Sequence, residues 1–392
     1  MGLSDADISY LRRAMRLACN ARGYAEPNPT VGCVIVKDGR AIGEGWTQAF
    51  GGPHAEPTAL AACTAESPEG ATAYVTLEPC SHTNKKTPPC APRLITAKLA
   101  RVVVGCLDPN PPVNGNGVAT LRAAGIAVDL APAELEAECK QVIAPFIAFT
   151  VLKRPYVTLK WAQTADGKVA GPGGRRMQIS NAASSRLVHE LRARSDAILV
   201  GVNTVLVDDP LLTARVDAPL RTPIRCVVDT TFRTPIESQL VRSVGAGPVV
   251  IITSAESLRH APERVAAFRA AGVEVIGVVT GETEPGAGDD RPVPEDVLCI
   301  LARRGVTHLL VEPGPTLARA YFRVTDRVWI FSSDRRVDDA TAPAAATVPG
   351  HFIPTKRIDA QGDQLSEYLN TRSPVFFDST WPSADFQLAR EA

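Results

Sequence analysis

The stretch AYVTLEPCSHTNKKTPPC, residues 73–90, decides the fold of the first half of the chain. An apolar run at 71–77 predicts a buried strand, and the residues after Cys90 predict a helix over 91–97. Cys80 and Cys90 therefore bracket a loop that leads from the carboxyl end of a strand to the start of a helix. This order is typical of an α/β sheet with helices packed on its faces.

The same alternation of strands and helices extends on both sides of this stretch. Upstream, strands are predicted over 31–36 and 41–46, joined by a hairpin signal at 37–40, and a helix over 55–64. Downstream, the pattern predicts a strand over 101–106, a helix over 117–124, a strand over 126–130 and a helix over 133–149. Residues 1–150 are therefore predicted to form one α/β domain.

A second domain is predicted after the polar and proline break at Lys153, Arg154 and Pro155. A new strand is expected over 156–162. The elements predicted after it are a helix over 181–194, strands over 197–200, 224–229 and 248–253, a helix over 295–304, a strand over 308–311 and a helix over 316–322. This pattern predicts a largely parallel α/β sheet over 155–392, with ligands at the carboxyl ends of its strands.

Composition narrows the class of partner. The 42 basic and 42 acidic residues of the 392 cancel, so the chain lacks the basic excess of proteins that bind long nucleic acids, and an RNA-editing enzyme is disfavoured. No apolar run approaches the roughly 20 residues that span a bilayer, so neither membrane insertion nor export is expected.

The nine cysteines indicate reduced thiols and a cytoplasmic protein, because their number is odd and no export signal precedes them. Seven of them lie among aliphatic residues or on helical faces and are predicted to be small core residues. These seven are Cys19, Cys33, Cys63, Cys106, Cys139, Cys226 and Cys299.

The two remaining cysteines and one histidine form a candidate metal site. His54, Cys80 and Cys90 would supply one imidazole and two thiolates, the three protein ligands of a catalytic zinc site whose fourth position holds water. Glu56 lies two residues after His54, so we expect it beside the metal rather than on it. There it would take a proton from the bound water and deliver it to a leaving amine, as the non-ligand glutamate of zinc deaminases does.

Two other interpretations stay open on the residues alone. Each short motif occurs often by chance, and two cysteines in a proline-rich loop are frequently inert, although all the motifs occur together here. A non-catalytic scaffold that uses zinc for stability would bind nucleotides and tolerate the loss of Glu56. A purely structural zinc usually has four protein ligands, and His82 is the only further candidate near the site.

The first half resembles the cytidine deaminase superfamily and, more closely, the bifunctional deaminase/reductase family of riboflavin biosynthesis. The matching stretches are PNPTVGCVIVKDG (27–39), GEGW (43–46), PHAE (53–56), AYVTLEPCSH (73–82), TPPC (87–90) and DPNPPVNGNG (108–117). The resemblance implies a three-layer αβα domain in which Asn28 and His82 contact the substrate base. Nine residues separate Cys80 from Cys90, where the family has eight, so we expect a bulge around 84–86.

The second half resembles the reductase domain of the same family. The matching stretches are RPYVTLKWAQTADGKVA (154–170), LRARSDAILVGVNTVLVDDPLLTAR (191–215) and VEPGPTLA (311–318). The resemblance implies an α/β fold like that of dihydrofolate reductase, with NADPH as the hydride donor. From the residues alone, Gly314 between a strand end and a helix start would let backbone amides hold a phosphate.

The resemblance also implies site residues in this half. Substrate contacts are expected at Lys160, Arg192, Leu212, Arg215 and Glu312. NADPH contacts are expected at Ala162, Gln178, Thr204, Asp208, Gly314, Pro315 and Thr316. Two features depart from the family: Gln178 stands where an aromatic residue is usual, and VWIFSSDRRVDDATAPAAATVPG (328–350) replaces the last strands.

These observations together predict an enzyme with one zinc ion per chain and two consecutive activities. The first is hydrolytic deamination of a diaminopyrimidine ribosylamino 5′-phosphate, and the second is NADPH reduction of its ribosyl group to ribityl. The expected partner is this small pyrimidine nucleotide, with no nucleic acid and no membrane, and a homo-oligomer formed through the second domain is left open. The alternative is a deaminase whose reductase half is degenerate.

Overall fold

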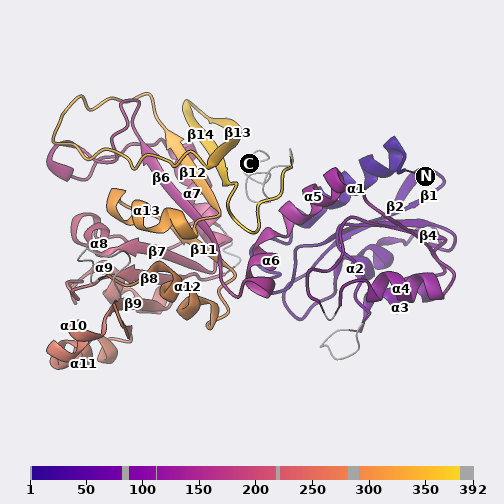
Figure 1. Cartoon of the computed structure of the whole chain (residues 1–392), viewed down its shortest axis with the longest axis horizontal. Helices are drawn as coiled ribbons and strands as arrows, with labels where there is room; N and C mark the ends of the chain where they lie inside the picture. The colour runs from indigo at the N-terminus through magenta and orange to yellow at the C-terminus, as the bar shows by residue number, and fades with distance from the viewer. Residues whose placement is uncertain (1, 82–87, 112, 218–220, 281–290, 380–392) are drawn as a thin grey trace. The chain divides into compact units, whose positions relative to one another are not determined.

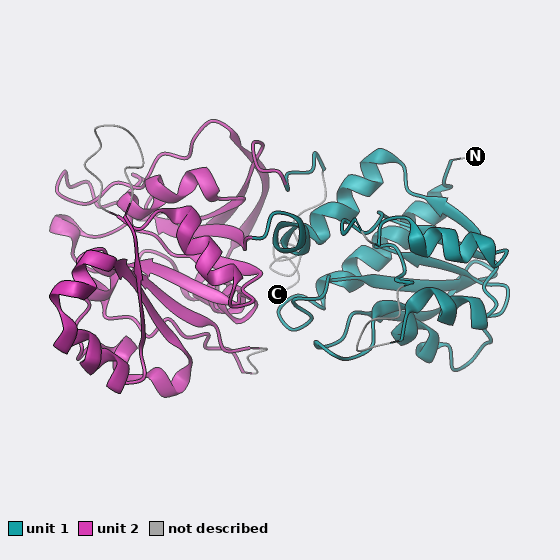
Figure 2. Ribbon diagram, turned by 60° about the horizontal axis from the view of Figure 1, so that its bottom comes forward, with its two compact units in different colours: residues 1–153, 375–392 teal, residues 154–374 magenta. Residues whose placement is uncertain are grey.

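The computed structural model describes residues 2–81, 88–111, 113–217, 221–280 and 291–379. The chain divides into two compact units (Figure 2), one of residues 1–153 with the segment from Val375 on, and one from Arg154 to Pro374. The division between Lys153 and Arg154 falls in the break noted in the sequence. The segment from Val375 on groups with the first unit, whereas the sequence pattern assigned it to the second.

A five-stranded sheet forms the centre of the described first unit, in the order β2-β1-β3-β4-β5 (Figure 1). Its strands are β1 (Gly32–Lys37), β2 (Arg40–Trp46), β3 (Thr72–Val75), β4 (Arg101–Val104) and β5 (Ala127–Leu130). β1 pairs antiparallel with β2 and β3, while β3, β4 and β5 run parallel. All five strands predicted in this half are confirmed, including the hairpin.

Helices cover both faces of this sheet, which confirms the three-layer prediction. The helices are α1 (Asp5–Cys19), α2 (Ala55–Ala62), α3 (Cys90–Thr96), α4 (Asn116–Ala123), α5 (Ala133–Val142) and α6 (Ala144–Val151). Glycines let two helices approach closely: a Cβ on Gly32 would lie 1.9 Å from the carbonyl oxygen of Ala14 in α1, and one on Gly45 would lie 2.4 Å from the amide of Ala59 in α2. Gly45 is paired with Cys33, the neighbour of Gly32 in β1, so the two glycines face opposite sides of the sheet.

One predicted helix of the first unit is two helices. The pattern predicted a single helix over 133–149, but α5 ends at Val142 and α6 begins at Ala144, with Pro145 in its first turn. Proline has no N–H to donate and its ring collides with the preceding turn, so it is tolerated in the first turn of a helix and not in its interior.

A nine-stranded sheet forms the centre of the described second unit, in the order β10-β9-β8-β7-β11-β6-β12-β14-β13. Its strands are β6 (Tyr156–Gln163), β7 (Ala197–Gly201), β8 (Ile224–Val228), β9 (Val249–Ser254), β10 (Glu274–Val278), β11 (His308–Val311), β12 (Arg327–Ser332), β13 (Phe352–Ala360) and β14 (Asp363–Asn370). The strands from β10 to β12 run parallel, and β14 and β13 are antiparallel. The prediction of a largely parallel sheet is confirmed.

The unfamiliar sequence at 328–350 does not remove a strand, as the departure from the family pattern had indicated. β12 begins at Arg327 and pairs in parallel with β6, and its other edge pairs antiparallel with β14. Val328 and Phe331 of this strand are fully buried. The apolar residues Val328–Phe331 therefore form a strand inside the sheet, although the sequence here departs from the family pattern.

Helices of the second unit connect and cover these strands. They are α7 (Ala182–Ala193), α8 (Val202–Asp208), α9 (Gln239–Arg242), α10 (Ala255–His260), α11 (Pro262–Ala270), α12 (Pro294–Ala302) and α13 (Pro315–Tyr321), with short 3-10 turns at Pro172–Gly174, Val244–Ala246 and Phe322–Val324. Val157, Leu159, Leu199 and Leu309 from adjacent strands lie in its core. Because β7, β8 and β11 run parallel and α8 directly follows β7, the carboxyl ends of these strands and the start of α8 lie at the same edge of the sheet.

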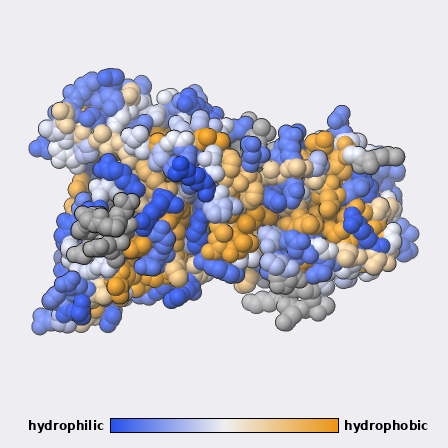
Figure 3. All heavy atoms as spheres, in the orientation of Figure 1, coloured by the Kyte–Doolittle hydropathy of each residue, from blue (hydrophilic) through white to orange (hydrophobic). Residues whose placement is uncertain are grey.

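Most of the cysteine predictions hold, with two exceptions. Cys19, Cys33, Cys106, Cys139 and Cys226 are buried, but Cys63 is half-buried and Cys299 is exposed on α12. None of the helices in the described part of the chain combines the length and the apolar character that a membrane span needs. On the face of the molecule seen in Figure 3, hydrophilic residues alternate with hydrophobic patches.

Candidate functional site

Three elements of the first unit bring His54, Cys80 and Cys90 together. His54 caps the start of α2, Cys80 follows β3, and Cys90 is the first residue of α3. Nδ1 of His54 lies 3.7 Å from Sγ of Cys80 and 3.4 Å from Sγ of Cys90. With bond lengths of about 2.0–2.3 Å, a tetrahedral zinc places neighbouring ligand atoms roughly 3.5–3.8 Å apart. The spacing of these donors fits a zinc ion.

The electrostatics of the two thiols also fit a cation. Both cysteines are buried, and the backbone N–H of Cys90 donates to Sγ of Cys80 at 3.4 Å. The hydrogen bond with Cys80, together with burial and the nearby Glu56, raises the pKa of the Cys90 thiol. Two buried thiolates side by side need a neighbouring positive charge, and a metal ion bound by one nitrogen and two sulfurs supplies it.

Glu56 lies in the first turn of α2, close to the three donors. Its side chain is 3% exposed. Burial raises the pKa of this carboxyl, and the neighbouring Cys80 raises it further. A carboxyl with a raised pKa holds its proton more readily than an exposed one, which suits a group that carries a proton between water and a leaving amine.

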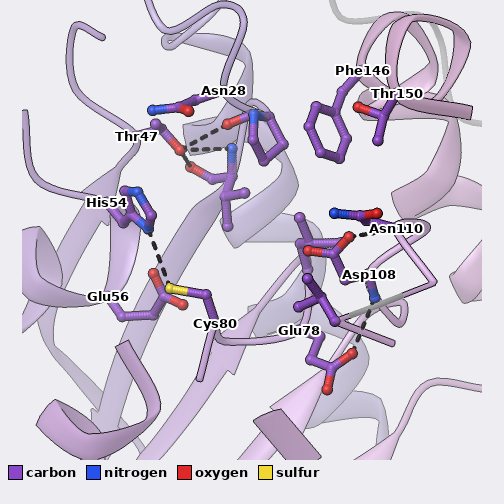
Figure 4. Close-up of a pocket in the computed structure, with 14 residues that line it drawn as sticks. Asn28, Thr47, His54, Glu56, Glu78, Cys80, Asp108, Asn110, Phe146 and Thr150 are labelled. Atoms are coloured by element: carbon purple, nitrogen blue, oxygen red, sulfur yellow. Dashed lines mark hydrogen bonds between the residues drawn. The ribbon is translucent and has the colours of Figure 1, made fainter. Parts of the chain in front are cut away.

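Two of the three candidate metal donors, His54 and Cys80, line a cavity of about 250 Å³ (Figure 4). It is lined by Asn28, Pro29, Val31, Thr47, His54, Glu56, Leu77, Glu78, Cys80, Asp108, Asn110, Val113, Phe146 and Thr150. In Figure 4, Asn28 and Glu56 lie on the same side as His54, and Asp108, Asn110 and Phe146 line the opposite side. Asn28 therefore reaches the cavity, as predicted, whereas His82 lies outside the described residues.

Glu78 fixes the segment that lines the opposite side of this cavity, a role that was not predicted from the sequence. One carboxylate oxygen accepts from the amides of Asp108 (3.1 Å) and Gly115 (2.9 Å), and the other accepts from the amides of Gly117 (2.8 Å) and Val118 (3.1 Å). The residue before the metal-binding Pro-Cys pair thus anchors the segment 108–118. The acid beside Cys80 and the DPNPPVNGNG motif were the available signals.

In the second unit, three of the predicted substrate contacts form one charged cluster. Arg192 donates to both carboxylate oxygens of Glu312, at 2.6 and 2.8 Å. Burial opposes ionisation of Glu312, but Arg192 and Lys160 outweigh it and lower its pKa to about 2. Burial also lowers the pKa of Lys160, and Glu312 counteracts this effect. The cluster places two cations around one partly buried carboxylate.

His189 belongs to the same cluster, although it was not predicted. The backbone N–H of Arg215 donates to its Nδ1 at 3.2 Å. Burial, followed by the charges of Arg192 and Arg215, lowers the pKa of His189 to about 4. The imidazole is therefore neutral near pH 7, and its other nitrogen carries the proton.

A larger cavity, of about 810 Å³, lies at the carboxyl ends of β7, β8 and β11. Thr204, Gly314, Pro315 and Thr316, four of the predicted NADPH contacts, line it. The remaining predicted residues, Ala162, Gln178, Asp208, Leu212 and Arg215, are not among its described lining.

Each of these remaining residues has its own surroundings. The side chain of Leu212 is buried, and its backbone adopts a left-handed conformation with φ 52°. Asp208 lies 4.0 Å from Arg176, and the side chain of Gln178 donates to the carbonyl of Ser180 at 2.7 Å. Ala162 lies on β6, opposite Phe331 of β12.

Comparison with known proteins gives the same division of the chain. Residues 4–106 match the cytidine and deoxycytidylate deaminase zinc-binding region, and residues 155–331 match the RibD C-terminal domain. The riboflavin biosynthesis protein RibD of Aquifex aeolicus is 38% identical over 331 residues, covering 84% of this chain and 87% of the relative. That of Escherichia coli is 36% identical, covering 88% and 92%.

Solved structures of similar proteins extend this likeness to the whole fold. A diaminohydroxyphosphoribosylaminopyrimidine deaminase/5-amino-6-(5-phosphoribosylamino)uracil reductase from Thermotoga maritima is 34% identical, with a TM-score of 0.77, and covers 93% of this chain and 99% of its own. RibD from Acinetobacter baumannii is 30% identical, with a TM-score of 0.75, and covers 93% and 98%.

Replacing Glu78 by glutamine tests the anchor. The amide group would turn two hydrogens toward two backbone N–H donors, so we expect the free energy of unfolding to fall by about 2–4 kcal/mol. Glu136→Gln is the matched control, because this half-exposed carboxylate pairs only with Lys140 at 2.7 Å and its loss costs about 0.5 kcal/mol or less. Chemical unfolding of the full chain measures both, and equal stability of the two variants would refute the anchor.

Proposed function

Because the chain belongs to the RibD family of bifunctional deaminases and reductases of riboflavin biosynthesis, we propose that its first unit deaminates diaminohydroxyphosphoribosylaminopyrimidine. We further propose that the second unit reduces the deaminated product, 5-amino-6-(5-phosphoribosylamino)uracil. The observation that carries the proposal is the cluster of His54, Cys80 and Cys90, two of which line one cavity together with the buried Glu56.

In the first unit, the proposed roles follow from the donor atoms. His54, Cys80 and Cys90 hold the zinc ion, which, when bound, acts as a Lewis acid that lowers the pKa of water. Glu56 accepts a proton from the attacking water and passes it to the departing amine, so that water adds and ammonia leaves. Asn28 orients the base, and its amide offers both a donor and an acceptor for this purpose.

In the second unit, the proposed roles divide between the charged cluster and the larger cavity. Lys160, Arg192 and Glu312 bind the phosphoribosyl part of the substrate, where fixed charges orient phosphate and hydroxyl groups. Thr204 and the segment 314–316 bind NADPH, the coenzyme of the family's reductase domain. When bound, NADPH would supply a hydride to the anomeric carbon of the ribosyl group; the bond from this carbon to the ring oxygen breaks, and the oxygen takes up a proton to give the ribityl chain. Roles for Ala162, Gln178, Asp208, Leu212 and Arg215 remain proposals from the resemblance alone.

The alternative of a degenerate reductase half is disfavoured. The RibD C-terminal domain model matches residues 155–331, and the partly buried Arg192–Glu312 pair is formed.

The remaining features of the proposal concern domains, assembly and location. We propose residues 1–150 and 155–374 as the two functional domains, because the segment from Val375 on groups with the first unit. A homo-oligomer formed through the reductase domain is the assembly that we propose. Small-molecule substrates are the partners of the family. The balanced charge supports a protein that binds no long nucleic acid, and the lack of an apolar run near 20 residues supports one without a membrane partner. The odd number of thiols supports a cytoplasmic location.

Zinc content tests the metal centre. We expect one zinc ion per chain in the wild-type protein and loss of this ion in a Cys80→Ser, Cys90→Ser double variant, because the remaining imidazole cannot hold the metal alone. Metal analysis of both purified proteins measures this. A Cys299→Ser variant is the control, since Cys299 is exposed on α12. Full occupancy in the double variant would eliminate the site.

The Glu56→Gln variant tests the proton transfer. We expect it to keep its zinc and its fold but to deaminate about 10²- to 10⁴-fold more slowly, the usual effect of removing a positioned acid/base. Ammonia release at saturating substrate is the measurement, with metal analysis of the same sample as the control. An unchanged rate would assign the proton transfer to another group.

Separate variants test whether the two activities are independent. Glu312→Gln and Asp208→Ala should abolish NADPH oxidation and leave ammonia release nearly intact. Glu56→Gln should do the reverse when the deaminated intermediate is supplied. Both activities are measured in each variant. Loss of both from one folded point variant would indicate a shared active site and overturn the assignment of one activity to each unit.

A further inference from the structure

The charges that line the larger cavity of the second unit are all positive. Its charged lining residues are Arg233, Arg291 and Arg323, and no aspartate or glutamate of the described chain lines it. The three arginines come from different elements: Arg233 follows β8, Arg291 precedes α12 and Arg323 follows α13. A cavity of this kind suits a ligand with several negative charges.

Arg233 differs from Arg323 in what its guanidinium faces. Nη2 of Arg323 forms an ion pair with Glu295 at 2.6 Å. Nη2 of Arg233 instead donates to the neutral side-chain oxygen of Asn203, at 3.1 Å. Asn203 also lines the cavity. The positive charge of Arg233 therefore lies beside an uncharged acceptor at the cavity wall.

The loop that carries Arg233 is anchored on both sides of this residue. Before it, Phe232 is 4% exposed and packs on Phe268, with ring centroids 5.0 Å apart. After it, the backbone N–H and the hydroxyl of Thr234 donate to one carboxylate oxygen of Asp229, at 2.6 and 2.7 Å. Phe232 adopts φ 54°, a conformation that non-glycine residues adopt only at a cost. The loop is thus held in one conformation before any ligand binds.

The same loop decides which charge the cavity presents at the end of β8. In dinucleotide-binding α/β folds, an acid in such a place accepts from the ribose 2′-hydroxyl of NAD, whereas an arginine accommodates the 2′-phosphate of NADP. Asp229 is the acid at the end of β8, but it is fully buried and bonded to Thr234. The hydroxyl-bearing Thr230 and Thr231 and the cation Arg233 line the cavity instead.

We propose that Arg233 binds the 2′-phosphate of NADPH and sets the preference of this chain for NADPH over NADH. The guanidinium offers a planar pair of donors to two phosphate oxygens, a contact that NADH cannot make. This inference rests on the proposed reductase activity of the second unit. It adds the residue that distinguishes the two coenzymes.

Binding of adenosine diphosphates to the full chain tests the contact without the nicotinamide ring. By calorimetry, 2′,5′-ADP should bind the wild-type protein more tightly than 5′-ADP. Arg233→Gln should weaken 2′,5′-ADP binding roughly 10- to 100-fold, the value of a hydrogen-bonded charge, and leave 5′-ADP unchanged. Arg242→Gln is the matched control, because Arg242 is exposed and pairs with Glu237.

Coenzyme kinetics with the deaminated substrate give the second measurement. Arg233→Gln should raise KM for NADPH by a similar factor and leave both kcat and the NADH parameters unchanged. Ammonia release by the same protein reports that the chain is folded. Arg233→Lys keeps the charge without the planar fork, so its KM for NADPH should lie between those of the wild type and Arg233→Gln.

The outcomes separate this inference from the proposed function. A wild-type protein that oxidises neither coenzyme would refute the reductase activity and the inference with it. A wild-type protein that oxidises NADPH but binds 2′,5′-ADP no more tightly than 5′-ADP would overturn the inference alone. The same holds if Arg233→Gln keeps the wild-type preference, or, should that variant fail to fold, if Arg233→Lys does.

Discussion

The constraint on which the first unit depends is the need to hold two buried sulfur donors and one imidazole close enough together to bind a single metal ion. Each of the three donors stands at a different element. His54 stands at the start of α2, Cys80 follows β3 and Cys90 opens α3. Their separations of 3.4 and 3.7 Å require the sheet to fix both helix starts, and the carboxylate of Glu78 ties the opposite wall to the same strand end.

The second unit meets a comparable constraint with charge instead of metal ligands. Taking Glu312 out of water is costly, and the bidentate contact with Arg192 and the nearby Lys160 offset that cost. Arg192 comes from the helix α7 and Glu312 from the end of the strand β11, so the pair forms only when this helix packs beside that strand end. In both units, then, the reactive groups gather where strands end, because the loops there leave a sheet that holds them rigidly.

The departures from the expected pattern show where local sequence misleads. Pro145 divides a helix that hydrophobic periodicity alone joins. The stretch after Arg327 was interpreted as replacing the last strands, because its residues depart from the family pattern. Its apolar residues nevertheless form β12, a strand between β6 and β14. Burial depends on the character of a side chain more than on its identity, so a substituted strand still pairs.

The sequence by itself determined the α/β class of both units and the family, and it singled out the candidate metal donors and Glu56, because these depend on local periodicity and on reactive side chains at characteristic spacings. Only the tertiary structure decided which residues line the two cavities. Phe146, His189 and Arg233 carry no local signal, and Asp229, an acid at the end of a strand, faces Thr234 rather than the cavity. Contacts between residues far apart in the chain are set by packing, which a linear pattern does not record.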